Sequence, residues 1–249
     1  MKLALIDLKI LRIQLRKELI LKKQKNMYEL SVKQWNPSVG CNFDCVYCKA
    51  SFKAQAKRQK QRCMKCYNYT PHVHPKRLNN YIPRTKGDEF IFTCASGDVS
   101  FCPTGFLKKI VKRIESQPNK TFLIQSKNPK TFDRVVFPDN VILGITLETN
   151  RDKGYSKVSK APVPTKRFKD FLKVDHPRKM ITVEPVMDFD LDVMLDWMKQ
   201  IKPFIVWLGY DSKSNCHFPE PELEKALSFH KAMQEAGIKV KLKTMRGAR

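Results

Sequence analysis

Three cysteines stand close together in the first fifth of the chain, with the spacing Cys-x3-Cys-x2-Cys. They are Cys41, Cys45 and Cys48, and an aromatic residue, Tyr47, comes directly before the third. Three thiolates on one short loop can bind three irons of a cubane [4Fe–4S] cluster and leave the fourth iron without a protein ligand, open for chemistry. The alternatives are a zinc knuckle and three unrelated buried thiols. Zinc sites usually take four ligands from paired cysteines, so this spacing favours the cluster.

A second group of ligand-type residues follows. Cys63 and Cys66 have Cys-x2-Cys spacing, and His72 and His74 come within the next ten residues. Two thiols and two imidazoles can complete a four-ligand zinc site. The thiol pair could instead contribute to an auxiliary cluster, or act as a redox-active or hydrogen-donating pair, and the sequence leaves these alternatives open. The further cysteines that an auxiliary cluster would recruit are Cys94 or Cys102.

The cysteine motif, with Tyr47 in place, resembles that of the radical S-adenosylmethionine (radical SAM) superfamily. In that family the open iron binds the amino and carboxylate groups of the methionine part of SAM, and the aromatic residue lies against the adenine. The resemblance therefore implies a [4Fe–4S] cluster and SAM as cofactors, with Cys41, Cys45 and Cys48 as cluster ligands and Tyr47 as a SAM contact. It also implies an electron donor of the reduced flavodoxin or ferredoxin type.

A second feature of the resemblance follows the predicted strand at 88–93. In radical SAM proteins the second strand ends in a small-small-acidic motif, commonly Gly-Gly-Glu, which binds the SAM amino group. Ser96, Gly97 and Asp98 resemble a variant of this motif. The resemblance implies that these three residues contact SAM, and a carboxylate suits an ammonium group chemically. The alternative is a simple Ser-Gly-Asp turn.

Polar residues recur where the apolar strands end. Strand and helix patterns alternate along the chain, which predicts a parallel sheet of about six or seven strands, an α/β fold of the open (β/α)6-type partial TIM barrel. The carboxyl ends of the strands form the face on which such barrels place their sites. By resemblance, Ser126 or Lys127 and Glu148 would contact the ribose or carboxylate of SAM, and Glu184 would line the substrate side. The alternative for each is a capping or loop-fixing role. The polar residues at the strand ends are Asp98, Lys127, Glu148, Glu184 and Asp211.

The spacing of apolar residues predicts the elements that position these residues. Helices are expected at 104–116, 190–201 and 221–236. Basic residues with Pro162 and Pro164 suggest a mobile basic loop between Arg151 and Lys179, above the same face. The expected strands are 30–35, 88–93, 121–125, 141–147, 180–183, 204–208 and 238–242. The basic residues of the expected loop are Lys153, Lys157, Lys160, Lys166 and Arg167.

The chain of 249 residues is long enough for one large domain. Residues 1–26 mix leucine and isoleucine with eight Lys or Arg at helical spacing, so we expect a basic amphipathic N-terminal extension there and the partial barrel domain over 27–249. An alternative is that the natural start is Met27. We expect a cytoplasmic protein, because no uncharged run approaches the ~18 residues of a membrane span, charges interrupt the N-terminus, and the cysteine spacings suggest metal sites in a reducing compartment.

The net charge of +24, from 48 Lys and Arg against 24 Asp and Glu, indicates an anionic partner. DNA or RNA is the commonest such partner, although a generally basic proteome would give the same balance. From Cys45 to Gly87 the chain has no acidic residue and 11 Lys or Arg, so the excess lies next to the cysteine motif. The aromatic residues in this stretch could stack on bases or belong to the core. They are Phe52, Tyr67, Tyr69 and Tyr81.

These features predict a radical SAM enzyme that cleaves SAM reductively to a 5′-deoxyadenosyl radical and modifies or repairs a nucleic acid or nucleotide substrate. The order of motifs after Met27 also resembles an uncharacterised radical SAM family of phages and mobile elements and, more distantly, the spore photoproduct lyases. One alternative is radical SAM chemistry on a peptide or small metabolite. Another is a non-enzymatic, zinc-containing nucleic-acid-binding protein.

Overall fold

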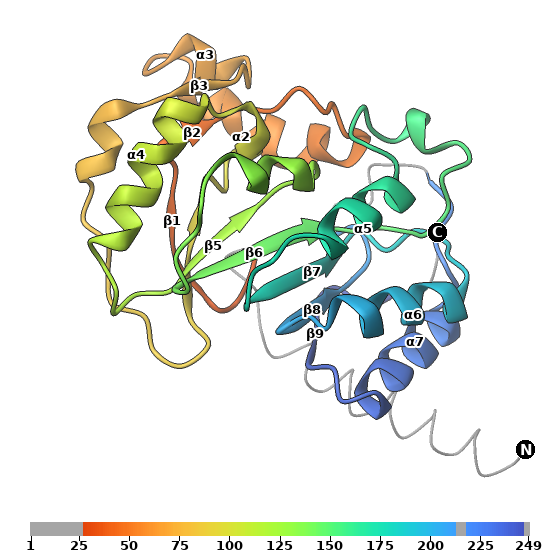
Figure 1. Ribbon diagram of the computed structural model, residues 1–249. Coiled ribbons are helices and arrows are strands. Elements are labelled where there is room, and N and C mark those ends of the chain that lie inside the picture. Colours follow the sequence, from red (N-terminus) through yellow and green to blue (C-terminus); the bar gives the residue numbers. More distant parts are fainter. Residues whose placement is uncertain (1–26, 213–217, 247–249) are drawn as a thin grey trace, which may run out of the picture.

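The computed structural model describes residues 27–212 and 218–246 of the chain. They form a seven-stranded sheet in which all neighbouring strands are parallel, and the sheet curls into a half barrel (Figure 1). The prediction of an α/β partial barrel is thereby confirmed. The strands, in their order across the sheet, are β1 (Ser31–Trp35), β4 (Phe90–Thr93), β5 (Phe122–Gln125), β6 (Val141–Thr146), β7 (Lys179–Val183), β8 (Ile205–Leu208) and β9 (Val240–Leu242).

Four longer helices cover the outer face of the sheet (Figure 1). Each buries an apolar stripe, as in α4, where Phe106, Leu107 and Ile110 face the core. Three of the helices begin and end within two residues of the predicted positions. The four helices are α4 (Thr104–Glu115), α5 (Pro164–Leu172), α6 (Leu191–Ile201) and α7 (Leu223–Glu235).

The prediction of a mobile basic loop between Arg151 and Lys179 is wrong for part of this range, because Pro164–Leu172 form helix α5. Pro164 stands at the first helical position, where its missing N–H costs nothing, and Phe168 and Phe171 are buried on one face. Arg167 lies on the same buried side and has no exposed surface. The nearby Lys160 and Lys166 do stay exposed. The predicted loop is therefore partly a core helix that carries one buried cation.

The concave interior of the half barrel changes from apolar to polar along the strands. Near the amino ends of β5 and β7, Leu123 and Met180 pack in one buried cluster with the ring of Tyr28, and Trp207 of β8 belongs to the same cluster. Further along the same inward face stand Gln125 and two threonines. The phenol of Tyr28 donates to Gln125 Oε1 over 2.8 Å, and Gln125 Nε2 donates to Thr146 Oγ1 over 2.9 Å. Polar groups thus face the interior at the carboxyl ends, where the sites of such folds lie.

The long connection from β1 to β4 holds the predicted cysteine motifs. Its elements gather beyond the carboxyl end of β1 (Figure 1). They are β2 (Ser38–Val39), α2 (Ala54–Ala56), α3 (Met64–Tyr67) and β3 (His72–Val73), with β2 and β3 paired as a small antiparallel sheet.

The basic amphipathic helix expected at 1–26 lies outside the described residues. Among the residues that the structure describes, none of the helices has the length and apolar character to cross a bilayer.

Candidate functional site

The structure brings the three cysteines of the first motif together. Cys41, Cys45 and Cys48 lie in one small cluster with Phe43, and all three thiols are free. The Sγ atom of Cys45 lies 3.1 Å from Ser159 Oγ, and the backbone N–H of Phe43 donates to Cys41 Sγ over 3.4 Å. Three free thiols on one partly buried loop are a donor set that suits a cluster with one open iron.

The charges around this loop favour a thiolate at Cys45. Its pKa is lowered, first by a hydrogen bond from the Cys48 thiol and, against the cost of burial, by the ammonium of Lys127. Burial raises the pKa of Cys41. Because the thiolate is the form that binds metals, the cation of Lys127 supports metal binding at Cys45.

Two glycines, Gly40 and Gly97, allow the cysteine loop to lie in close contact with neighbouring backbone. Gly40 has a φ of 89°, and a Cβ there would lie 2.4 Å from the backbone carbonyl of Thr70. A Cβ on Gly97 would lie 2.5 Å from the carbonyl oxygen of Gly40. The two loops exchange backbone hydrogen bonds, from Gly40 N–H to Ser96 O over 3.0 Å and from Asp98 N–H to Gly40 O over 3.2 Å. Gly97 therefore joins the predicted SAM-binding loop to the cysteine loop.

The carboxylate of Asp98 ties the loop after β4 to the loop after β5. Its Oδ1 accepts from Ser126 Oγ over 2.6 Å and from Ser100 N–H over 2.9 Å, and its Oδ2 accepts from the backbone N–H of Lys127 over 2.8 Å. A carboxylate offers about four acceptor positions. The role of Asp98 as a SAM contact stays a prediction, with Oδ2 the less occupied oxygen among the contacts described. The hydroxyl of Ser126 is directed at Asp98.

Lys127 and Glu148, both predicted SAM contacts, form a buried ionic cluster with Arg167. Oε2 of Glu148 lies 2.8 Å from Arg167 Nη1, and Oε1 contacts the ammonium of Lys127. The phenols of Tyr47 and Tyr155 both donate to Oε1. Burial alone would raise the pKa of Glu148, but Arg167 and Lys127 outweigh it and hold the pKa well below its usual range. Two cations against one carboxylate leave one net positive charge beneath the cysteine loop.

Two tyrosines, Tyr47 and Tyr69, lie close to the three cysteines. Tyr47 directs its hydroxyl to Glu148, and the Lys127 ammonium lies 4.7 Å from the centre of its ring. Its predicted contact with adenine stays a prediction. Tyr69, which follows the second cysteine motif, lies close enough to Cys48 and Cys41 that their charges add to burial in raising its pKa.

Glu184 bonds to a different partner from the residues around Glu148. Its carboxylate pairs with the ammonium of Lys243, and burial raises the pKa of Glu184 more than this cation lowers it. Asp211, also predicted at a strand end, is buried, and its carbonyl accepts from Arg246 Nη2 over 3.3 Å. The strand-end residues therefore do not all share one set of bonds: Asp98, Lys127 and Glu148 are connected, whereas Glu184 pairs with Lys243 and Asp211 with Arg246.

Three residues of the site were not predicted as site residues from the sequence: Arg167, Tyr155 and Ser159. The first had a detectable signal, because Pro164 followed by Phe168 and Phe171 at helical spacing indicates a helix with a buried side. No comparable pattern marked the other two, whose roles depend on how the chain folds back to Cys45 and Glu148.

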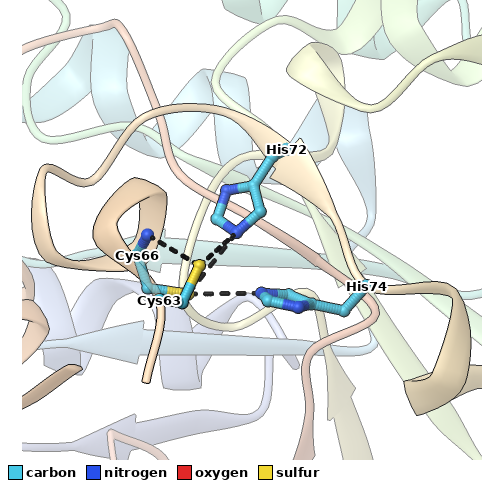
Figure 2. A group of neighbouring side chains, drawn as sticks. All are labelled: Cys63, Cys66, His72 and His74. Atoms are coloured by element: carbon cyan, nitrogen blue, oxygen red, sulfur yellow. Dashed lines mark hydrogen bonds between the residues drawn. The ribbon is translucent and has the colours of Figure 1, made fainter. Parts of the chain in front are cut away.

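The second cysteine motif also forms a compact group (Figure 2). One ligand atom from each of Cys63, Cys66, His72 and His74 lies within 4.8 Å of the other three. Cys94 and Cys102, the alternative partners in an auxiliary cluster, lie elsewhere. Both are buried in the principal hydrophobic core.

Comparison with known proteins places the sequence in a family. Residues 26–206 match the family model described as "Protein of unknown function (DUF5131)", so the chain belongs to that family. No curated protein matches the chain in sequence.

Solved structures show what the fold resembles. A radical SAM methyltransferase from Sphaerobacter thermophilus aligns with a TM-score of 0.53 and 14% identity, over 89% of this chain and 68% of that one. SuiB from Streptococcus suis aligns with a TM-score of 0.52 and 11% identity over 86% of this chain and 49% of SuiB, so the chain spans about half the length of SuiB. SuiB bound to its precursor peptide SuiA aligns with a TM-score of 0.53 and 10% identity, over 85% of this chain and 48% of that one. The chain therefore has the fold of radical SAM enzymes.

Proposed function

We propose that this member of the DUF5131 family is a radical SAM enzyme whose Cys41, Cys45 and Cys48 bind a [4Fe–4S] cluster. The observation that carries the proposal is the gathering of three free thiols beside a buried ammonium, on a fold shared with radical SAM enzymes. When bound, the cluster would supply the electron that cleaves SAM and releases a 5′-deoxyadenosyl radical.

The chain's own residues would hold SAM by charge. The net positive charge of Lys127, Arg167 and Glu148 would stabilise the cluster and the SAM carboxylate, because opposite charges attract strongly in a buried setting. Oδ2 of Asp98 would accept from the SAM ammonium. Glu184, paired with Lys243, would line the substrate side.

A nucleic acid or nucleotide is the proposed substrate. The segment that follows Cys48 exposes a row of cations, and the ammonium of Lys57 lies 4.0 Å from the ring centre of Tyr67. Such a surface beside the site suits a phosphate backbone. A reduced flavodoxin or ferredoxin-type protein would donate electrons, in the cytoplasm. The exposed cations are Lys49, Lys57, Arg58, Lys60, Arg62 and Lys65.

A peptide substrate is the second candidate. The observation that favours it is the likeness to SuiB, which has been solved with its precursor peptide. The charge of the protein favours the nucleic acid. Phosphates would neutralise the exposed cations next to the cysteine loop, whereas a peptide of ordinary composition carries too few negative charges to do so.

Anaerobic reconstitution tests the function. The reduced protein is assayed for iron, labile sulfide and 5′-deoxyadenosine, with DNA, with RNA, with peptides and with no substrate. We expect about four irons per chain and a stimulation of 5′-deoxyadenosine release by a polynucleotide. Cys45→Ala should lose both, whereas Cys102→Ala, which removes a buried thiol outside the loop, should keep both. Zinc without iron or sulfide would contradict the proposal and favour a zinc-containing binding protein.

A further inference from the structure

The four side chains of the second motif converge on one point (Figure 2). Nε2 of His72 lies 3.4 Å from Cys63 Sγ and 3.5 Å from Cys66 Sγ, and Nε2 of His74 lies 3.2 Å from Cys66 Sγ. A single imidazole nitrogen has one proton or one lone pair, so it cannot make a good hydrogen bond to two sulfurs at once. An ion at the centre accounts for all these approaches together.

The spacing fits a tetrahedral zinc ion. With Zn–S of about 2.3 Å and Zn–N of about 2.0–2.1 Å, a regular tetrahedron has S···N edges of about 3.5 Å. The observed S···N distances of 3.2, 3.4 and 3.5 Å lie at or just below this value. A Rieske-type [2Fe–2S] cluster, which has the same ligand types, places its cysteines and histidines on different irons. Here both imidazoles approach a sulfur directly, so the group suits one ion.

Neighbouring backbone groups orient the ligands as in metal sites. Nδ1 of His72 lies 2.8 Å from the carbonyl oxygen of Thr70, which fixes the proton on Nδ1 and leaves Nε2 for a metal. The backbone N–H of Cys66 points to Cys63 Sγ over 3.4 Å. His72 and His74 are two residues apart on extended chain, so their side chains leave from the same side of it. Val73 between them packs on the principal core.

The same segment is bonded to the chain that leads into the cluster loop. β3 pairs with β2, the N–H of His74 donates to Pro37 O over 2.7 Å, and the N–H of Cys41 donates to Tyr69 O over 3.3 Å. A bound ion would therefore fix residues 63–74, and these residues in turn hold the backbone before and at Cys41.

We propose that Cys63, Cys66, His72 and His74 bind one zinc ion, and that this ion positions residues 37–41 at the entrance to the cysteine loop. Binding forms two Zn–S and two Zn–N bonds and releases the two thiol protons to water. With four protein ligands the ion has no open position, so its role is structural. The site shares no ligand with the loop of Cys41, Cys45 and Cys48, and it stands whether or not that loop binds iron.

Metal analysis tests the binding. Full-length protein should contain one zinc per chain, and Cys66→Ser should lose most of this zinc, because metal binding and local folding depend on the complete ligand set. Cys102→Ala and His176→Gln serve as controls for a thiol and an imidazole outside the group, and both should keep the zinc. Cys45→Ala should also keep it, which separates this site from the proposed cluster.

Cobalt substitution tests the ligands without relying on a variant that folds. Wild-type protein stripped of zinc and given Co²⁺ should show the absorption of a tetrahedral ion with thiolate-to-cobalt charge transfer, and Cys45→Ala, in which the first cysteine loop is incomplete, should show the same band. Absence of the charge-transfer band, or iron in place of zinc in the purified protein, would overturn the proposal.

Hydrogen exchange tests the positioning role. Removal of zinc by a chelator should speed exchange at the amides of Cys41 and His74 by about tenfold or more, because local opening sets their protection. Amides of β6 and β7, on the far part of the sheet, should not change. Unchanged protection at residues 37–41 would overturn the positioning role, even with zinc bound.

Discussion

The guanidinium of Arg167 lies 2.8 Å from Oε2 of Glu148, and neither side chain has any exposed surface. Arg167 belongs to α5 in the outer helix layer, whereas Glu148 follows β6 at the mouth of the half barrel. The pair therefore connects the helix layer with the residues beneath the cysteine loop. A charge that is buried without its partner is strongly unfavourable, so each member depends on the other.

Replacement of Arg167 should destabilise the fold. Arg167→Met leaves the Glu148 carboxylate buried with Lys127 as its remaining cation, and we expect the free energy of unfolding to fall by roughly 3–5 kcal/mol. The adjacent Lys166 is the matched control, since its pair with Asp170 is solvent-facing, and Lys166→Met should cost less than about 1 kcal/mol. Urea denaturation measures both. Equal losses in the free energy of unfolding would show that the buried pair contributes no more to stability than the exposed pair.

The depressed pKa of Glu148 predicts acid sensitivity. In the unfolded chain this carboxyl titrates near its ordinary pKa of about 4.3, whereas in the folded protein it stays ionised to lower pH. The unfolded state therefore binds more protons below that value, so the contribution is complete above it and is lost as the pH falls towards the folded pKa.

Thermal unfolding of wild type and Glu148→Gln between pH 6 and about pH 3 measures this effect. The wild type should lose stability more steeply with falling pH than the variant, even if the variant starts lower. Other acid-sensitive groups are common to both proteins, so the difference between the two slopes reports Glu148. Parallel curves would contradict the prediction.

Gly97 should tolerate no side chain. A Cβ would lie 2.5 Å from Gly40 O and 2.7 Å from Gly40 N, so Gly97→Ala has to separate two backbones. We expect a loss of about 1–3 kcal/mol in the free energy of unfolding, together with lower iron content after reconstitution. Gly105→Ala, on α4 with open space around it, should instead gain about 0.4–1 kcal/mol. Normal iron binding by Gly97→Ala would argue against a role for this contact in shaping the cysteine loop.

The basic segment should determine how nucleic acid binding responds to salt. Affinity for duplex DNA falls with salt, so the slope of log affinity against log salt is negative. If Lys57, Arg58 and Lys60 each contact a phosphate, changing all three to Gln should make this slope less steep by about 2–3. The same change at the exposed Lys108, Lys109 and Lys112 of α4 is the control and should leave the slope nearly unchanged. Fluorescence anisotropy over a series of salt concentrations provides the slopes. Equal reductions by both triple variants would indicate binding by overall charge alone.

The sequence was informative where periodicity decides the structure. Strand β6, for example, is an apolar run buried on both faces, and the prediction matched it to within one residue. Helix α4 was predicted equally well, because its apolar residues recur at helical spacing. Both depend on local patterns that the whole fold then reinforces.

Arg167 shows why part of the site could not be predicted. An arginine among lysines is expected at the surface, and only a partner distant in sequence justifies its burial. That partner, Glu148, was predicted at the strand end, but nothing local to either residue indicates their contact. Asp98 is a related case: its position was predicted, whereas its bonds to Ser126 and Ser100 depend on how two loops meet.

The ring of Tyr28 and its apolar neighbours pack together inside the half barrel. The hydroxyl of the same tyrosine lies 2.8 Å from Gln125 Oε1 and 2.8 Å from Thr182 Oγ1, so one side chain belongs both to the apolar packing and to the polar groups of the interior. Loss of Tyr28 would therefore disturb the inner packing of the sheet and the orientation of the polar groups at the same time.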